Sequence, residues 1–282
     1  MSPERALASV VLVCLCITGG GARAASHEPR VAATSPIVAV DSIAITVSDV
    51  DRAVEFYSHA IVVSDMDAAY GRLREFHVGY ASSGPQRLPD WNPNAAGIRA
   101  FYFRDPDEHN LEVLQFPAGK GLPKWHVHDG RTFLGIDHTA IVIADTAASL
   151  AFYRDTLGLK VVGTSENYGT EQEHLNNVLG AHLQITSLRA PRGPGIEFLQ
   201  YLAPLSGRPA PADTHANDLW SWQIIMTAAR PRELERMLHD SHFTLVSSNV
   251  GRVGDGALDW EDAFIARDPD GHTALISSGK QQ

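Results

Sequence analysis

The sequence predicts an α+β fold assembled from repeated β-α-β-β-β units. One observation is a strand-and-helix pattern that occurs twice: residues 41–47 precede Phe56-Tyr57, and 96 residues later residues 137–143 precede Phe152-Tyr153. A second is a strand, Asp-Pro-Asp turn, strand pattern that closes each half of the chain. Alternating apolar residues indicate the strands, and apolar residues three or four apart indicate the helices.

The two repeats have different spacings. The Asp-Pro-Asp turn at 105–107 returns at 268–270, which is an offset of 163 residues, whereas the first strand returns after 96. The first half therefore lacks about 67 residues (163 less 96) that the second half contains. We expect two complete units in the second half, and in the first half the front of one unit fused to the back of another.

Each expected element follows from this pattern. In the first half we expect strands at 41–47, 61–63 and on both sides of the turn, and helices at 50–60 and 68–73. In the second half we expect strands at 137–143, 159–163, 181–189, 195–202, 222–228 and beside the second turn, and helices around Leu150, at 171–180 and at 232–239.

The chain divides into five expected segments. Residues 1–24 resemble a secretory signal peptide, because an apolar run is broken by glycines and followed by Ala22-Arg23-Ala24. Cleavage near Ala24 predicts a secreted or periplasmic protein. The other segments are a flexible lead-in (25–39), a shortened first half (40–117), a Gly- and Pro-rich linker (118–134) and the second half (135–278).

Composition excludes several classes of partner and site. There are 23 Lys and Arg against 33 Asp and Glu, so the net charge is -10, which disfavours nucleic acid as a partner. No apolar stretch is long enough to span a membrane. Both cysteines, Cys14 and Cys16, lie in the expected signal peptide, so the mature chain would lack thiol nucleophiles and cysteine metal sites. A small-molecule substrate is the expected partner.

The sequence resembles the vicinal oxygen chelate superfamily of glyoxalases, bleomycin-resistance proteins, extradiol dioxygenases and epimerases. The resemblance rests on Asp137-His138 at the start of a strand, on Phe152-Tyr153, on Leu157-Gly158-Leu159 and on the Asp-Pro-Asp turn. It covers nearly all of residues 40–278 and implies tandem βαβββ modules that form cupped mixed sheets around a metal. In that family a His from the first strand of a module and a Glu from its last strand bind the ion.

The resemblance implies His138, Glu197 and Gln223 as metal ligands. His59 with Glu112 is the second candidate set. Glu112 and Glu197 each interrupt an apolar strand, where a carboxylate is costly unless it is paired, metal-bound or facing outward. Imidazole and carboxylate suit Zn, Fe, Ni, Co or Mn. At other family positions, Ser42 replaces a His and Leu275 replaces a Glu.

The resemblance implies a metal-dependent lyase or isomerase, or a dioxygenase, that acts on a small oxygenated molecule. The ion would serve as a Lewis acid, and Glu197 would be a ligand and the candidate catalytic base. The set holds one His, which makes a ring-cleaving iron enzyme a second choice. The alternative is a metal-free small-ligand-binding protein of the bleomycin-resistance kind, for which a homodimer is expected. Residues 171–177 are expected to form either a lid or a solvated helix capped by Thr170.

Overall fold

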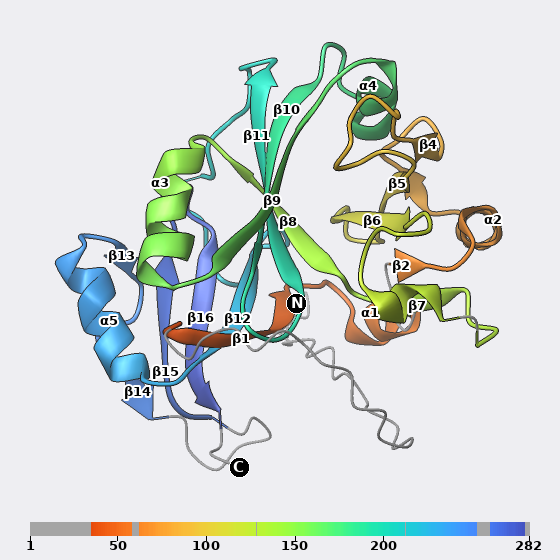
Figure 1. Ribbon diagram of the computed structural model, residues 1–282. Coiled ribbons are helices and arrows are strands. Elements are labelled where there is room, and N and C mark those ends of the chain that lie inside the picture. Colours follow the sequence, from red (N-terminus) through yellow and green to blue (C-terminus); the bar gives the residue numbers. More distant parts are fainter. Residues whose placement is uncertain (1–34, 58–61, 128, 212, 253–259, 280–282) are drawn as a thin grey trace.

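The computed structural model describes residues 35–57, 62–127, 129–211, 213–252 and 260–279. They form three mixed sheets with helices packed against them, which confirms the expected α+β class (Figure 1). The expected signal peptide and the segment at 58–61, which includes His59, lie outside the described residues.

The central sheet is one complete β-α-β-β-β unit. Its elements are β8 (His138–Ile143), α3 (Thr146–Leu150), which continues as the π-helical turn η2 (Ala151–Thr156), β9 (Lys160–Asn167), α4 (Thr170–Asn176), β10 (His182–Arg189) and β11 (Gly195–Ala203). The strand order is β8-β11-β10-β9, so the first and last strands are parallel neighbours. α4 ends earlier than expected, because Asn177 adopts the left-handed conformation that terminates helices.

The C-terminal sheet repeats this unit. It contains β12 (Trp222–Ala228), α5 (Pro231–Asp240), β13 (Thr244–Leu245), β14 (Gly251–Arg252), β15 (Trp260–Arg267) and β16 (Thr273–Gly279). β1 (Ile37–Ile45) joins its edge, antiparallel to β12, giving the order β1-β12-β16-β15-β13 with β14 also on β15. β1 starts four residues before the expected strand, because Ile37 and Val40 are buried in the core.

The first-half sheet is a shorter unit. It contains β2 (Val62–Val63), α2 (Met66–Glu75), β3 (Gly79–Tyr80), β4 (Gln86–Arg87), β5 (Arg99–Arg104) and β6 (Asn110–Gln115), in the order β3-β5-β6-β2-β7 with β4 on β5. β7 (Phe133–Gly135) comes from the expected linker, which also forms the short helix η1 (Pro123–His126). β1 and α1 (Val50–Tyr57) precede this unit in the chain, and β1 pairs with the C-terminal sheet instead.

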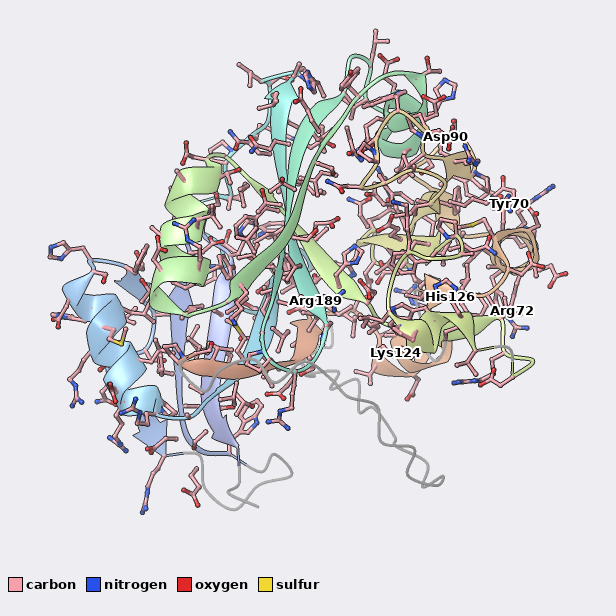
Figure 2. All side chains as sticks on the ribbon, in the orientation of Figure 1. Tyr70, Arg72, Asp90, Lys124, His126 and Arg189 are labelled. Atoms are coloured by element: carbon pink, nitrogen blue, oxygen red, sulfur yellow. The ribbon has the colours of Figure 1, made fainter. Side chains whose placement is uncertain are left out.

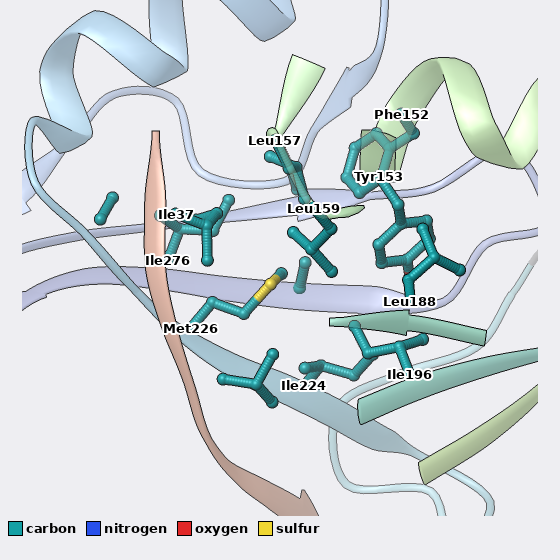
Figure 3. Packing of buried hydrophobic residues seen from close by; sticks show 14 of the residues in the cluster. Ile37, Phe152, Tyr153, Leu157, Leu159, Leu188, Ile196, Ile224, Met226 and Ile276 are labelled. Atoms are coloured by element: carbon teal, nitrogen blue, oxygen red, sulfur yellow. The ribbon is translucent and has the colours of Figure 1, made fainter. Parts of the chain in front are cut away.

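The largest core lies between the central and C-terminal sheets and the helices that cover them (Figure 3). Phe152 and Tyr153, the aromatic pair of the repeated motif, are fully buried there. The Tyr153 hydroxyl donates a hydrogen bond of 3.2 Å to Asp268 of the second Asp-Pro-Asp turn. The repeated motif thus joins the central unit to the C-terminal unit by packing.

The two Asp-Pro-Asp turns have the same internal hydrogen bonds. Asp268 accepts from the backbone N–H groups of Asp270 and His272 at 3.0 and 2.8 Å, and it contacts the His272 ring at 2.8 Å. Asp105 makes the equivalent bonds at 2.9, 2.8 and 2.7 Å, the last two to His109. The sequence pattern therefore extends to Asp-Pro-Asp-x-His, because the histidine closes each turn onto its buried aspartate.

Candidate functional site

Three ionisable side chains from two sheets converge where the first-half and central sheets meet. The Nε2 atom of His138 lies 3.6 Å from an Oε2 atom of Glu112 and 3.6 Å from an Oε2 atom of Glu197. His138 opens β8 and Glu197 lies on β11, whereas Glu112 comes from β6 of the first-half sheet. We call Glu112, His138 and Glu197 the junction site.

Strand register explains why these residues meet. β8 and β11 are parallel neighbours in which His138 lies opposite Gly195 and Ala140 opposite Glu197. Because side chains alternate between the faces of a strand, His138 and Glu197 share one face of the central sheet. The chain crosses from β7 to β8 through Gly135, whose φ is +149° and where a Cβ would lie 3.1 Å from the Trp125 ring. His138 therefore enters the central sheet directly beside the first-half sheet.

Asp137 orients the imidazole of His138. Its Oδ2 atom lies 3.1 Å from His138 Nδ1 and accepts a hydrogen bond of 2.8 Å from Arg189, and its Oδ1 atom accepts one of 2.7 Å from the indole of Trp125. In Figure 2, Arg189 lies at the end of the central sheet nearest Lys124 and His126, which flank Trp125. With Nδ1 engaged by Asp137, Nε2 is directed at the two glutamates.

Burial and charge act in opposite directions at this site. Burial disfavours the charged imidazole, but Glu197, Asp137 and Glu112 outweigh it and raise the pKa of His138 well above its usual value. Burial raises the pKa of Glu112, although His138 opposes the shift. The pKa of Asp137 lies well below its usual range, because the bonds and charges of His138 and Arg189 and the bond from Trp125 overcome its burial.

The junction site stays within reach of solvent and has a further polar neighbour. The side chains of His138, Glu112 and Glu197 are 15%, 20% and 25% exposed. Ser187 on β10 donates a hydrogen bond of 2.7 Å to the Oε1 atom of Glu197, which leaves Oε2 toward His138. A small molecule could therefore reach the glutamates, whose orientation the protein already sets.

Two tyrosines flank the junction site, one from each sheet. Tyr102 lies directly opposite Glu112 in the β5–β6 pair. Burial and the nearby charges of Glu112 and Glu197, with a contribution from Tyr201, raise the pKa of Tyr102 well above its usual value. Burial also raises the pKa of Tyr201 on β11, although a hydrogen bond from Asn176 opposes the shift. Both hydroxyls therefore remain protonated donors near neutral pH.

The structure brings together only part of the expected ligand set. His138 and Glu197 meet as expected, and the third member of the cluster is Glu112 from the second candidate set. Gln223 lies on β12 of the C-terminal sheet, opposite Ala44 and Thr273. In the register of that sheet it holds the position that His138 holds in the central sheet. The second half alone was expected to enclose the site, whereas the central sheet pairs with the first-half sheet.

Sequence reasoning missed the residues around His138. Asp137 was visible beside the histidine, and its position alone could have suggested an orienting carboxylate. Trp125 lies in the segment expected to be a linker, and Arg189 lies at the far end of another strand. Nothing in the local sequence marks these two residues as neighbours of Asp137.

The described residues were compared with what a metal site and a membrane span require. Among the described residues, no group of three or more His, Cys, Asp or Glu side chains is arranged, as it stands, so that it could hold a metal ion. No helix in the described ranges is long and apolar enough to cross a membrane.

Comparison with known proteins identifies the family. Residues 135–276 match the Glyoxalase/Bleomycin resistance protein/Dioxygenase superfamily, which confirms the resemblance seen in the sequence. No match was found among curated proteins.

Several solved structures are similar in fold. A glyoxalase family protein from Bacillus cereus is 18% identical, with a TM-score of 0.45 over 54% of this chain and 98% of that one. Glyoxalase I from Zea mays is 12% identical, with a TM-score of 0.49 over 78% of this chain and 66% of that one. A glyoxalase family protein from Enterococcus faecalis is 17% identical, with a TM-score of 0.36 over 51% and 96%.

Proposed function

Because the chain belongs to the Glyoxalase/Bleomycin resistance protein/Dioxygenase superfamily, we propose that it is a metal-dependent enzyme acting on a small oxygenated molecule. The proposed ligands are Glu112, His138 and Glu197. The observation that carries the proposal is the convergence of two glutamates, from different sheets, on one imidazole nitrogen. The reaction classes that fit are a lyase or isomerase step, or a dioxygenation.

The donor types of these three side chains and two of their separations support a divalent transition metal, and the three would have to close around it. Zinc-type bonds to nitrogen and oxygen of about 2.1 Å, at a tetrahedral angle, hold the two donor atoms about 3.4 Å apart. Each glutamate oxygen lies 3.6 Å from His138 Nε2, so a small closure around an ion would satisfy both bonds. Asp137 on Nδ1 is the outer carboxylate that metal-binding histidines commonly have. One imidazole with two carboxylates suits Zn, Fe, Ni, Co or Mn.

The roles of the protein groups follow from their contacts. A bound ion would supply Lewis-acid polarisation of substrate oxygens. Asp137, held by Trp125 and Arg189, keeps His138 in one orientation. Ser187 fixes one oxygen of Glu197, and the other oxygen is the candidate to accept a substrate proton.

A second candidate function is metal-free binding of a small ligand. The observation that favours it is that His138 is already balanced by carboxylates at 3.1 and 3.6 Å. These carboxylates balance the charge of a protonated His138 without a metal ion. The junction site would then hold an oxygenated ligand by hydrogen bonds alone.

Metal titration decides between the two functions. Full-length mature protein, purified without a chelator or a metal-binding tag, is titrated with Co²⁺ and Zn²⁺. We expect about one equivalent per chain, and loss of binding in His138→Ala, Glu112→Ala and Glu197→Ala. Gln223→Ala is the matched control, because it alters the equivalent position of the other sheet, and it should bind as the wild type does.

Each other result has a defined meaning. Absence of metal binding by the wild type would leave the metal-free ligand-binding function. Loss of binding in Gln223→Ala, with binding retained in Glu112→Ala, would return the site to the second half alone.

Export is proposed on the sequence of residues 1–24. An apolar run followed by Ala22-Arg23-Ala24 supports cleavage near Ala24 and a secreted or periplasmic location. Expression of the full chain in a bacterial host, with cell fractionation and N-terminal sequencing, should recover a product that starts near Ala25. A cytoplasmic product that still begins at the first residues would contradict export.

A further inference from the structure

Helix α4 connects the two sheets that form the junction site. It belongs to the central unit by sequence but packs over the first-half sheet (Figure 1). Leu175 on α4 is buried in a cluster with Leu88, Ala95 and Ala100, and Tyr102 packs against that cluster. α4 was expected to be a lid or a solvated helix capped by Thr170. Its N-cap is Gly169, without a side-chain hydrogen bond, and its buried face holds it in place.

One side of α4 holds Tyr102. The hydroxyl of Ser82 donates a hydrogen bond of 2.6 Å to the backbone carbonyl of Leu175, and it accepts one of 2.7 Å from the backbone N–H of Tyr102. Ser82 is buried. Among the described residues, the phenol oxygen of Tyr102 has no hydrogen-bond partner. Tyr102 is therefore fixed beside Glu112 with an unused donor.

The other side of α4 holds Tyr201 through a chain of amides that is buried except at its last member, Asn176. Asn92 donates to Asn167 at 2.6 Å, Asn167 donates to Gln172 at 3.1 Å, and Gln172 donates to Asn176. The chain ends where Asn176 donates to the hydroxyl oxygen of Tyr201 at 2.5 Å.

Backbone groups fix the direction of this chain. The side-chain oxygen of Asn92 accepts from the N–H of Ala95, which can only donate, and its nitrogen donates to the carbonyl of Glu166, which can only accept. Each following amide is then oriented by the one before it. The oxygen of Tyr201 thus acts as an acceptor for Asn176. Its own proton is left to point elsewhere, and the described residues offer it no acceptor.

Both hydroxyls belong to the face that carries the junction site. Tyr102 and Glu112 are directly opposite one another, so they share a face. On β11, Glu197, Leu199 and Tyr201 share a face because side chains alternate. Four residues of strand separate Glu197 from Tyr201 by about 13 Å. Leu199 lies between them and packs with Leu183. Along this face of β11 a carboxylate, a buried leucine and a tyrosine hydroxyl follow one another.

We propose that Tyr102 and Tyr201 are substrate-binding residues, held by α4 so that their hydroxyls donate hydrogen bonds to substrate oxygens. The inference rests on the proposed function, because it places the reacting oxygens of the substrate at the junction site. Tyr102 serves oxygens close to Glu112, and Tyr201 serves an acceptor at the far end of the molecule. The substrate class is an elongated molecule with oxygen atoms at one end, an apolar body, and a carboxylate or carbonyl at the other end.

The test uses two probes on Co²⁺-loaded full-length protein. Catechol carries vicinal oxygens alone, and 3,4-dihydroxybenzoate adds a carboxylate at the far end. Affinities are measured by calorimetry and by the visible spectrum of Co²⁺. Tyr102→Phe should weaken both probes about threefold to tenfold, and Tyr201→Phe should weaken 3,4-dihydroxybenzoate by that factor while sparing catechol. Tyr168→Phe, an exposed tyrosine outside this face, is the control and should change neither.

Asn176→Asp tests positioning by α4. The new carboxylate still accepts the hydrogen bond from Gln172. It has no N–H to donate to Tyr201, so the Tyr201 hydroxyl must donate its proton to residue 176 instead. The variant should weaken 3,4-dihydroxybenzoate as Tyr201→Phe does, and the double variant should be no weaker than either single one. A purely structural role would lower the melting temperature and affect both probes alike.

The outcomes separate this inference from the proposed function. Unchanged Co²⁺ binding with unchanged probe affinities in both Phe variants would overturn the inference and leave the metal site standing. Additive losses in the Asn176→Asp, Tyr201→Phe pair would overturn positioning by α4. A wild-type chain that binds no Co²⁺ would overturn the proposed function and the inference together.

Discussion

The central and C-terminal sheets have the same topology and opposite chemical character. Each has its first strand parallel to its last, and in register Gln223 takes the place of His138 and Leu275 the place of Glu197. The central sheet faces the first-half sheet, which supplies Glu112 from β6. The C-terminal sheet receives only β1, in which Ser42 lies opposite Ile225. The cluster of one histidine and two glutamates therefore occurs where two sheets face each other, and the shortened side has Gln223, Leu275 and Ser42 at the related positions.

The comparison separates what maintains the fold from what creates the site. Ile141 and Phe198 of the central sheet, and Ile224 and Ile276 of the C-terminal sheet, are all buried in the shared core. These residues lie on the helix-covered faces, and they keep the same apolar character in both sheets. The opposite faces differ at the equivalent positions, where His138 and Glu197 stand in one sheet and Gln223 and Leu275 in the other. The stability of the fold thus depends on the helix-covered face of each sheet, and the chemistry depends on the opposite face.

The largest predicted effect concerns the turns, which the C-terminal and first-half sheets share and the central sheet lacks. Asp268→Ala removes the acceptor for two backbone N–H groups, for the ring of His272 and for the hydroxyl of Tyr153. Leaving buried donors unsatisfied should lower the free energy of unfolding by about 3 kcal/mol, and Asp105→Ala should cost a similar amount. Urea unfolding measures both, and a loss below about 1 kcal/mol in either would refute this role.

Exchanging the equivalent residues sharpens the comparison. Leu275→Glu places a carboxylate on β16 directly opposite two apolar residues, Ile225 and Ile265, with Arg267 only diagonal to it. We expect a loss of about 2 kcal/mol in the free energy of unfolding. Glu197→Leu is the reverse exchange and leaves His138 with Asp137 and Glu112, so it should change stability by less than about 1 kcal/mol. Equal losses in the two variants would show that the opposite faces are not distinct.

Trp125→Phe tests whether the expected linker contributes to the junction site. The change keeps a ring in the buried position but removes the indole donor to Asp137. We expect metal affinity to fall about tenfold, as losses of outer hydrogen bonds typically do, with a stability cost of about 1 kcal/mol. Trp91→Phe, in an exposed loop, is the matched control. Unchanged metal affinity by calorimetry would remove Trp125 from the site.

Much of the fold could be predicted from the sequence, because its signals are local. The strand at Trp222–Ala228 was predicted at its observed bounds, and the helices at 231–240 and 66–75 were predicted within two residues at each end. The repeated strand-and-helix pattern also predicted the strand and helix that form β1 and α1. The ends that differed, such as the start of β1, depend on burial against other strands, which local pattern cannot show.

The site was harder to predict than the fold. His138 and Glu197 lie within one unit, and their positions repeat in every unit, so sequence identified them. The partner of that unit depends on how the three sheets pair in space. Glu112 was therefore assigned to a separate candidate site and Gln223 to this one. Register within a unit can be read from sequence, but the pairing of units is a tertiary property.

The smallest predicted effect is the pH dependence contributed by the first turn. Burial lowers the pKa of His109, but hydrogen bonds to Asp105 and to the Leu219 carbonyl outweigh it and raise the pKa above its usual value. Both ring nitrogens contact acceptors, so the charged form is the one that satisfies the folded state.

The folded chain binds this proton more tightly than the unfolded chain, whose His titrates near about 6.5. The stabilisation is therefore fully present below that value and is lost as the pH rises through the folded pKa. The free energy of unfolding should fall more steeply with rising pH above about 6.5 in the wild type than in His109→Gln. Parallel curves for the two proteins would show that the turn is held without the charged histidine.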